Sequence, residues 1–245
     1  MRSTKFAMLA ALALVAGISA KAQNADEILK KHEAAMGGAE KWDKIKTLKM
    51  TGTIKAQGMD IGITETIESG KAMRTDISVM GMNGYTIVTT KEGYTYMPFG
   101  GGPAKVDTMK ADAVKGEQSK LNLKEANNIV DYKAKGTKAE YVGTDSVNSA
   151  LCYKIKFTEK DGDESTSFYD AKTYYLLRTE SKVKVDDQET EVAVLYSDYK
   201  TLPEGIVMPM SINAQGGEVA FKSVEVNKPI DASVFVPTMP AATKN

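Results

Sequence analysis

Apolar and polar residues alternate along most of the chain from Thr47 onwards. In "TLKMTGTI" the side chains of Leu48, Met50 and Ile54 would point to one face, and the Thr and Lys side chains to the other. Such period-two alternation predicts β-strands with one buried and one wet face. Turn signals at Asn83-Gly84, Glu92-Gly93 and Asp161-Gly162 join the strands as hairpins. The pattern therefore predicts a mainly β (α+β) protein with about 11–12 antiparallel strands, rather than a parallel α/β fold.

One predicted strand, "TYYLLRTES" (residues 173–181), is apolar on both faces. Thr173, Tyr175 and Leu177 would point one way, and Tyr174 and Leu176 the other. We expect one side to face a cavity or a covering helix, and the other to pack under a loop or terminal segment.

Two segments show helical patterns instead. In "NADEILKKHEAAMGG", Asn24 is a candidate N-cap with Glu27 three residues later, and Gly37-Gly38 is a stop signal. One face of this helix carries Ile28, Leu29, His32, Ala35 and Met36. A short second helical turn is expected around Trp42 and Ile45. Such a helix needs an apolar surface to lie on.

The strand pattern breaks between Phe99 and Gly136. Three glycines and Pro103 predict a flexible loop at the start, and the remainder is charged and weakly helical. An insertion of this length is more often functional or mobile than inert.

The first residues have the pattern of a signal peptide. Arg2 and Lys5 give a positive start, an apolar run of 13 residues follows from Phe6 to Ile18, and Ala20-Lys21-Ala22 is a small-x-small cleavage site. The run is too short to span a bilayer, which takes about 20 apolar residues. We expect cleavage after Ala22 and export to the periplasm.

The 223 residues that follow suit a single domain, 23–245. Without Arg2, Lys5 and Lys21, 29 basic side chains stand against 32 acidic ones, so the net charge is −3. This balance argues against binding to nucleic acid or to an anionic membrane surface, because both favour basic patches.

The residues that usually carry catalysis are scarce. His32 is the one histidine and lies on the apolar stripe of the predicted helix, so a packed histidine is favoured over a general base. Cys152 is the one cysteine, which excludes an intramolecular disulfide and favours a small buried side chain over a reactive thiol. We predict that the protein is not an enzyme.

No metal site or cofactor is predicted either. "DGDEST" lacks the glycine and the terminal glutamate of a calcium loop and is interpreted as a hairpin turn. "FGGGPAK" is not followed by the GK[ST] of a phosphate-binding loop. The 11 methionines after residue 22 are compatible with an adaptable apolar pocket and equally with an ordinary core.

Several segments resemble the exported outer-membrane-lipoprotein-sorting-like proteins of the LolA/LolB-like superfamily. They are "GGAEKWDKIKTLKMTGTI", "FYDAKTYYLLRTES", "YSDYKTLPEGIVMPMSI" and "NKPIDASVFVPTMP". The resemblance implies an incompletely closed antiparallel β-barrel with covering helices and an apolar cavity on its concave face. It transfers no catalytic residue.

The leading hypothesis is a periplasmic carrier or binding protein for a lipid or an acylated lipoprotein, acting as a monomer with transient donor and acceptor partners at the inner or outer membrane. The predicted cavity lining consists of Met50, Ile61, Ile63, Met73, Ile155, Phe157, Val194, Met208 and Met210. The predicted gate loop consists of Phe99, Gly100, Gly101, Gly102 and Pro103. The alternative is a non-catalytic structural or interaction module of the cell envelope, in which the same residues form a filled core.

Overall fold

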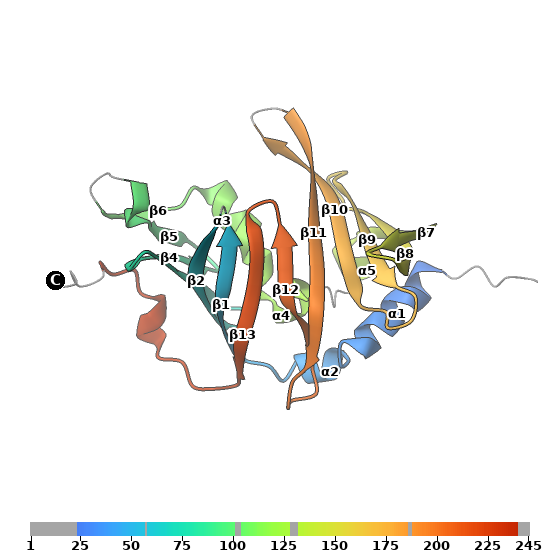
Figure 1. The fold of residues 1–245 in the computed structure, drawn as a ribbon, viewed down its shortest axis with the longest axis horizontal. Helices are drawn as coiled ribbons and strands as arrows, with labels where there is room; N and C mark the ends of the chain where they lie inside the picture. The colour runs from blue at the N-terminus through green and yellow to red at the C-terminus, as the bar shows by residue number, and fades with distance from the viewer. Residues whose placement is uncertain (1–23, 57, 101–103, 128–131, 186–187, 240–245) are drawn as a thin grey trace, which may run out of the picture.

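The computed structural model describes residues 24–56, 58–100, 104–127, 132–185 and 188–239. Within them, thirteen strands form one antiparallel sheet in the order β6-β5-β4-β3-β2-β1-β13-β12-β11-β10-β9-β8-β7 (Figure 1). Among the described residues the edge strands β6 and β7 do not pair with each other, so the sheet stays open. The predicted fold class, an incompletely closed antiparallel β-barrel, is confirmed. The sheet has one strand more than the 11–12 that the sequence predicts.

The sheet consists of two meanders that meet in its middle. The first half of the chain gives β1 (Thr47–Ala56), β2 (Met59–Glu68), β3 (Ala72–Val79), β4 (Met82–Thr89), β5 (Gly93–Tyr96) and β6 (Val106–Thr108). The second half gives β7 (Lys138–Val147), β8 (Ala150–Thr158), β9 (Glu164–Asp170), β10 (Leu176–Val185), β11 (Gln188–Thr201), β12 (Val207–Ala214) and β13 (Gly217–Val226). The last strand pairs with the first, so the chain returns to the place where the sheet began.

Except for η3 (Ala232–Phe235), which packs on the outer side of β3, the helices cover one face of the sheet and one end of it. They are α1 (Ala25–Ala35), α2 (Ala39–Trp42), η1 (Pro98–Gly100), α3 (Ala111–Gln118), η2 (Ser119–Leu121), α4 (Leu123–Ala126) and α5 (Tyr132–Lys135). In Figure 1, α3 and α4 lie behind the central strands, and α1 crosses below β10. In the described part of the chain, no helix combines the length and the apolar character that crossing a membrane requires.

Helix α1 begins and ends where the sequence predicts. The Asn24 side chain accepts a hydrogen bond from the Glu27 N–H at 2.8 Å, which satisfies a donor that the first helical turn leaves unpaired. Gly37 and Gly38 follow with φ of +102° and +86° and stop the helix. The predicted apolar stripe faces the sheet, with Ile28, His32 and Met36 buried.

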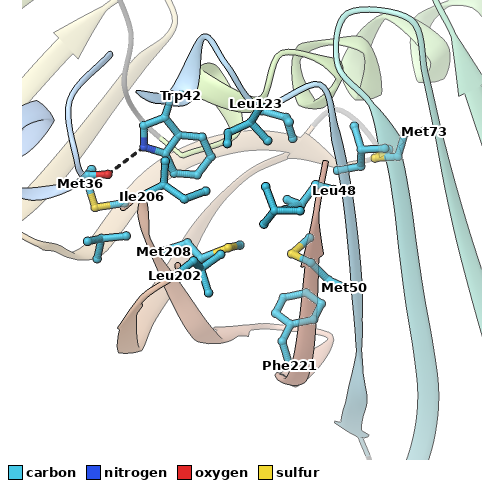
Figure 2. Packing of buried hydrophobic residues seen from close by; sticks show 14 of the residues in the cluster. Met36, Trp42, Leu48, Met50, Met73, Leu123, Leu202, Ile206, Met208 and Phe221 are labelled. Atoms are coloured by element: carbon cyan, nitrogen blue, oxygen red, sulfur yellow. Dashed lines mark hydrogen bonds between the residues drawn. The ribbon is translucent and has the colours of Figure 1, made fainter. Parts of the chain in front are cut away.

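The end of α1 is fixed to β12 by hydrogen bonds. The Met36 carbonyl accepts from the Trp42 indole N–H at 2.8 Å (Figure 2) and from the Val207 N–H of β12 at 3.0 Å. A Cβ at Gly37 would lie 2.4 Å from the Gly205 carbonyl oxygen, so only glycine allows this approach. The sequence "AMGG" therefore sets both the helix end and its docking point.

A large apolar cluster lies between the central strands and the covering helices (Figure 2). Its buried members include Met36, Trp42, Leu48, Met50, Met73, Leu123, Leu202, Ile206, Met208 and Phe221. They come from both halves of the chain, so the two meanders share one core. Methionine is frequent here, as an adaptable filler of irregular space.

The segment "TYYLLRTES" departs from its prediction at its start. Strand β10 begins only at Leu176, because Tyr174 has φ +60° and the Asp170 carboxylate accepts from the Thr173 N–H at 2.6 Å, which makes a tight turn. The strand prediction for Thr173–Tyr175 is therefore wrong. Leu176 packs under α1, as expected for one face of the strand. On the other face, Leu177 packs against Val147, Cys152 and Phe168 of β7, β8 and β9, so the prediction of a covering loop or terminal segment is wrong.

The C-terminal segment is bound to the outer part of β3 and β4. The Arg74 guanidinium donates to the Val234 carbonyl at 3.0 Å and stacks over the Tyr85 ring at 4.3 Å. The Tyr85 hydroxyl donates to the Thr238 carbonyl at 2.9 Å. This segment thus supports the first meander from outside and leaves its other face to the helices.

Candidate functional site

An apolar cavity of about 420 Å³ lies between the sheet and the helices. Its walls come from β1, β2, β3 and β10–β13, and its roof from α1, η2 and α4. The apolar lining side chains are Met36, Leu48, Met50, Ile63, Ile67, Met73, Leu123, Leu176, Val194, Met208, Ile212, Val219 and Phe221. The volume is within the range of about 300–1,000 Å³ typical of small-molecule sites.

Five of the nine residues predicted to line a cavity lie around this one: Met50, Ile63, Met73, Val194 and Met208. They come from five different strands, so the fold brings together positions up to 158 residues apart in the sequence. Whether they contact a ligand stays a prediction.

The other four lie elsewhere. Ile155 is fully buried in the cluster under α1, and Phe157 lines a second, polar hollow. Met210 packs against the main cluster, but neither it nor Ile61 is among the described residues that line the apolar cavity. Strand β8 carries Ile155 and Phe157 and lies near the β7 edge of the sheet, beyond the cavity.

The pattern of the sequence does not single out several lining residues. Leu48, Ile67 and Phe221 share the alternation of the predicted ones, but alternation fixes only the face of a strand and not the distance along it. His32 and Met36 belong to the apolar stripe of α1, which the sequence shows, and Leu123 comes from α4. What was missing is the knowledge that α1 and α4 cover the same strands.

The predicted gate lies away from this cavity. Phe99 and Gly100 are in η1, and the Phe99 ring packs so closely on β4 that a Cβ at Gly84 would lie 2.9 Å from its Cε2 atom. Gly101, Gly102 and Pro103 fall outside the described residues. The described part of the gate loop therefore covers a strand rather than the cavity.

Buried His32 is a polar group in the cavity wall. Its side chain is 1% exposed, and its Nδ1 atom lies 2.8 Å from the Tyr174 carbonyl oxygen. Burial lowers the pKa of His32 to about 4. The backbones of Tyr174 and Asn127 oppose this shift, because they favour the protonated ring. The packed histidine that the sequence predicts is confirmed, and the ring is neutral at neutral pH.

A second polar group, Glu65 of β2, lines the same cavity. Burial raises the pKa of its carboxyl group; Lys120 opposes this effect and Glu117 adds to it. Lys120 itself is paired with Glu117 at 2.7 Å. Four strands separate β2 from β10, so Glu65 and His32 lie on opposite sides of the cavity.

A larger hollow, of about 830 Å³, lies on the other side of α1. Its lining is mostly charged or hydroxyl-bearing: Asp26, Lys30, Glu33, Ser119, Lys124, Glu125, Tyr132, Lys133, Lys135, Thr137, Glu159, Ser165, Ser167, Tyr169 and Thr179, with the apolar Leu29, Ala39 and Phe157. Ion pairs cross it, at 2.7 Å between Lys133 and Asp26 and at 2.5 Å between Lys135 and Glu125. The hydrogen bonds from Lys133 and Tyr132 lower the pKa of Asp26.

The remaining reactive groups are not assembled into a centre. Among the described residues, no three His, Cys, Asp or Glu side chains lie close enough to hold a metal ion together. Cys152 is fully buried, and burial raises the pKa of its thiol, so the small buried cysteine that the sequence predicts is confirmed.

Comparison with known proteins supports the fold. No protein-family model and no curated protein sequence matches the chain. Among solved structures, a DUF1329 family protein from Desulfovibrio piger aligns with a TM-score of 0.57 and 13% identity over 86% of this chain and 96% of that one. A LolA superfamily protein from Nitrosomonas europaea aligns with a TM-score of 0.53 and 10% identity over 87% and 98%.

A third structure, a domain assigned to outer membrane lipoprotein sorting from Vibrio parahaemolyticus, aligns with a TM-score of 0.54 and 11% identity over 86% of this chain and 95% of that one. At such identities the likeness shows the fold. The chain has a LolA-like fold, as the sequence resemblance implies.

Proposed function

We propose that this chain with a LolA-like fold is a carrier or binding protein that holds the apolar chain of a lipid or of an acylated protein in its 420 Å³ cavity. The observation that carries the proposal is the lining of that cavity, which is mostly apolar on its strands and on its roof. Two structural neighbours are described as a LolA superfamily protein and as a lipoprotein-sorting domain, which makes acylated protein one of the candidate cargoes.

The binding mechanism is desolvation. Moving one CH₂ group from water into an apolar site is worth roughly 0.8 kcal/mol, so a modest length of acyl chain gives useful affinity without polar contacts. Met36, Met50, Met73 and Met208 suit such a task, because their flexible side chains adapt to different chain positions. No bond is made or broken, so the function needs no catalytic residue.

The proposal places the protein in the periplasm, after removal of residues 1–22 as a signal peptide, as a single domain that acts as a monomer. Cargo would pass to it from a donor in or near one membrane and leave it for an acceptor at another. The net charge of −3 for residues 23–245 supports transient contacts with such partners rather than adhesion to anionic lipid.

The first test is native mass spectrometry of the protein purified from its own envelope fraction, followed by organic extraction of whatever is bound. A stoichiometric adduct that contains an acyl chain is the expected result. A mass without adduct, together with no uptake of added palmitic acid or palmitoylated peptide, would overturn the proposal and favour the interaction module with a filled core.

A matched pair of variants tests the place of binding. Val194→Trp should fill the cavity from β11 and reduce palmitic acid uptake at least tenfold, since the indole occupies space that the ligand needs. Ala193→Trp puts the same side chain at the exposed neighbouring position of the same strand and should leave uptake unchanged. Equal uptake by both variants would place binding outside this cavity.

A further inference from the structure

The Tyr174 carbonyl fixes the tautomer of His32. A carbonyl oxygen only accepts hydrogen bonds, so the Nδ1 atom of His32, 2.8 Å away, must carry the hydrogen. The carbonyl is held in place by the turn before β10, where the Tyr174 N–H donates to the Asp170 carbonyl at 2.9 Å. Because the buried ring is neutral at neutral pH, the other nitrogen, Nε2, is an acceptor with a free lone pair.

No hydrogen-bond donor of the described residues is paired with Nε2 of His32. Nε2 is buried and has no hydrogen-bond partner among the described residues, and His32 lines the apolar cavity. The neighbouring Asn127 backbone favours the protonated ring and therefore presents its carbonyl oxygen, which cannot donate a hydrogen bond to Nε2. Unpaired buried polar atoms are rare in folded proteins, since each has lost its hydrogen bonds to water.

We propose that Nε2 of His32 is the polar recognition point of the cavity, and that the bound molecule carries a hydrogen-bond donor, a hydroxyl or an amide N–H, next to its apolar chain. This inference rests on the proposed function and narrows it. It favours long-chain alcohols, hydroxylated acyl chains and N-acyl amides over simple esters, ethers and hydrocarbons, which have no such donor. Glu65 and Lys120 lie across the cavity. Tyr196 and Tyr199 of β11 also line it, and the Tyr199 hydroxyl already donates to the Leu176 carbonyl.

The chain offers a direct probe of this contact. His32 is its one histidine, so ¹⁵N-histidine labelling gives one pair of imidazole nitrogen signals without assignment. The ligand-free protein should show a protonated-type Nδ1 and an unprotonated-type Nε2. We would titrate it with 1-dodecanol and with 1-methoxydodecane, which share the apolar chain and differ in the donor.

Dodecanol should move the Nε2 signal upfield as the lone pair accepts its hydroxyl, and methoxydodecane should bind without that shift. Dodecanol should also bind about threefold to tenfold more tightly, the effect of one net hydrogen bond. Binding of both compounds with no difference at Nε2 would overturn the inference and leave the proposed function standing. Binding of neither would overturn both.

Variants give a second measurement. His32→Phe removes the acceptor and keeps a ring, so the preference for dodecanol over methoxydodecane should disappear. Ala34→Phe introduces the same side chain at an exposed position of α1 and should keep the preference. A preference that survives His32→Phe would assign the recognition to another group. If His32→Phe does not fold, the nitrogen signals of the unaltered protein still decide the question.

Discussion

The two hollows on either side of α1 differ in chemistry more than in size. The apolar cavity has half the volume of the polar hollow, about 420 against 830 Å³, but its strand walls carry Leu, Ile, Val, Met and Phe. The polar hollow faces β8–β10, and its strand wall carries the hydroxyl-bearing side chains of Ser165, Ser167 and Thr179 instead. An acyl chain gains free energy only where it displaces water from apolar walls, so the smaller hollow is the better site.

Helix α1 is the partition between them. His32 and Met36 face the apolar cavity, whereas Lys30 and Glu33 face the polar hollow. The rings of His32 and Tyr169 are 4.9 Å apart where the two sides approach each other. One amphipathic helix thus separates two environments, and changes on its two sides should have different consequences.

The largest contrast should come from placing a carboxylate in each hollow. Met208→Asp puts a charge on a wall residue that is 4% exposed, and Lys120, the cation among the described lining residues, is already paired with Glu117. The change should cost about 3–5 kcal/mol of unfolding free energy. Palmitic acid uptake should fall with it. Urea unfolding and a binding titration of the folded fraction measure the two effects.

Ser165→Asp is the matched change in the polar hollow, where water and several Lys side chains can solvate the new charge. It should alter the free energy of unfolding by less than about 0.5 kcal/mol, as surface substitutions usually do. Similar losses for the two variants would show that the hollows are not different environments.

A second contrast concerns how the free energy of unfolding depends on pH through His32 of helix α1. Because burial lowers the pKa of His32 to about 4 from 6.5, the unfolded chain binds a proton before the folded one does. Stability should therefore fall as pH decreases from 6.5 to 4, and this residue alone should remove about 3 kcal/mol over that window. Above pH 6.5 its contribution should be constant.

Carboxylates titrate between pH 6.5 and 4 as well. The contribution of His32 is therefore measured as the difference between the pH profiles of a variant and the unaltered protein. His32→Gln keeps an amide N–H that can donate to the Tyr174 carbonyl but cannot titrate, and its pH profile of unfolding free energy should be flatter by that amount. Parallel profiles for the two proteins between pH 6.5 and 4 would mean that His32 is already charged or well solvated in the folded state.

Glu65 should give a smaller effect of opposite sign at the far wall of the cavity. Burial raises the pKa of its carboxyl group above 4.5, so its contribution to stability decreases as pH rises from 4.5 through the folded value. Glu65→Gln should therefore be more stable relative to the unaltered protein at pH 7 than at pH 4, with thermal unfolding as the measurement. The reverse order would show that Lys120, not burial, dominates at this site.

The sequence predicts much of the fold, because its signals are local. Asn24, Gly37-Gly38 and Asp161-Gly162 act over three or four residues, and the alternation of Leu48 and Met50 identifies a buried face without reference to other strands. The start of β10 was missed because the Asp170 side chain binds the Thr173 N–H and forms a turn, which competes with the apolar pattern of Thr173–Tyr175.

The cavity could be predicted only in part, since it depends on strand order. Alternation selects Ile155 as readily as Met208, but β8 lies beyond the cavity because the second meander starts at the far edge and returns towards β1. Position along a strand is equally undetermined, which is why Ile61 was chosen and Ile67 was not. Both quantities depend on strands that are far away in the sequence.

The smallest contrast concerns the ion pairs that cross the polar hollow. Lys133→Met breaks the pair with Asp26 that joins α5 to α1, and both side chains are more than half exposed. Water and salt screen such a pair, so the Tm should change by no more than about 1 °C at 0.15 M salt. Palmitic acid uptake should also stay unchanged, because α1 is held from its other side by the buried contacts of Ile28, His32 and Met36. A large loss of uptake with an unchanged Tm would instead mean that the polar hollow controls access to the apolar cavity, and the two environments would then have to be treated as one site.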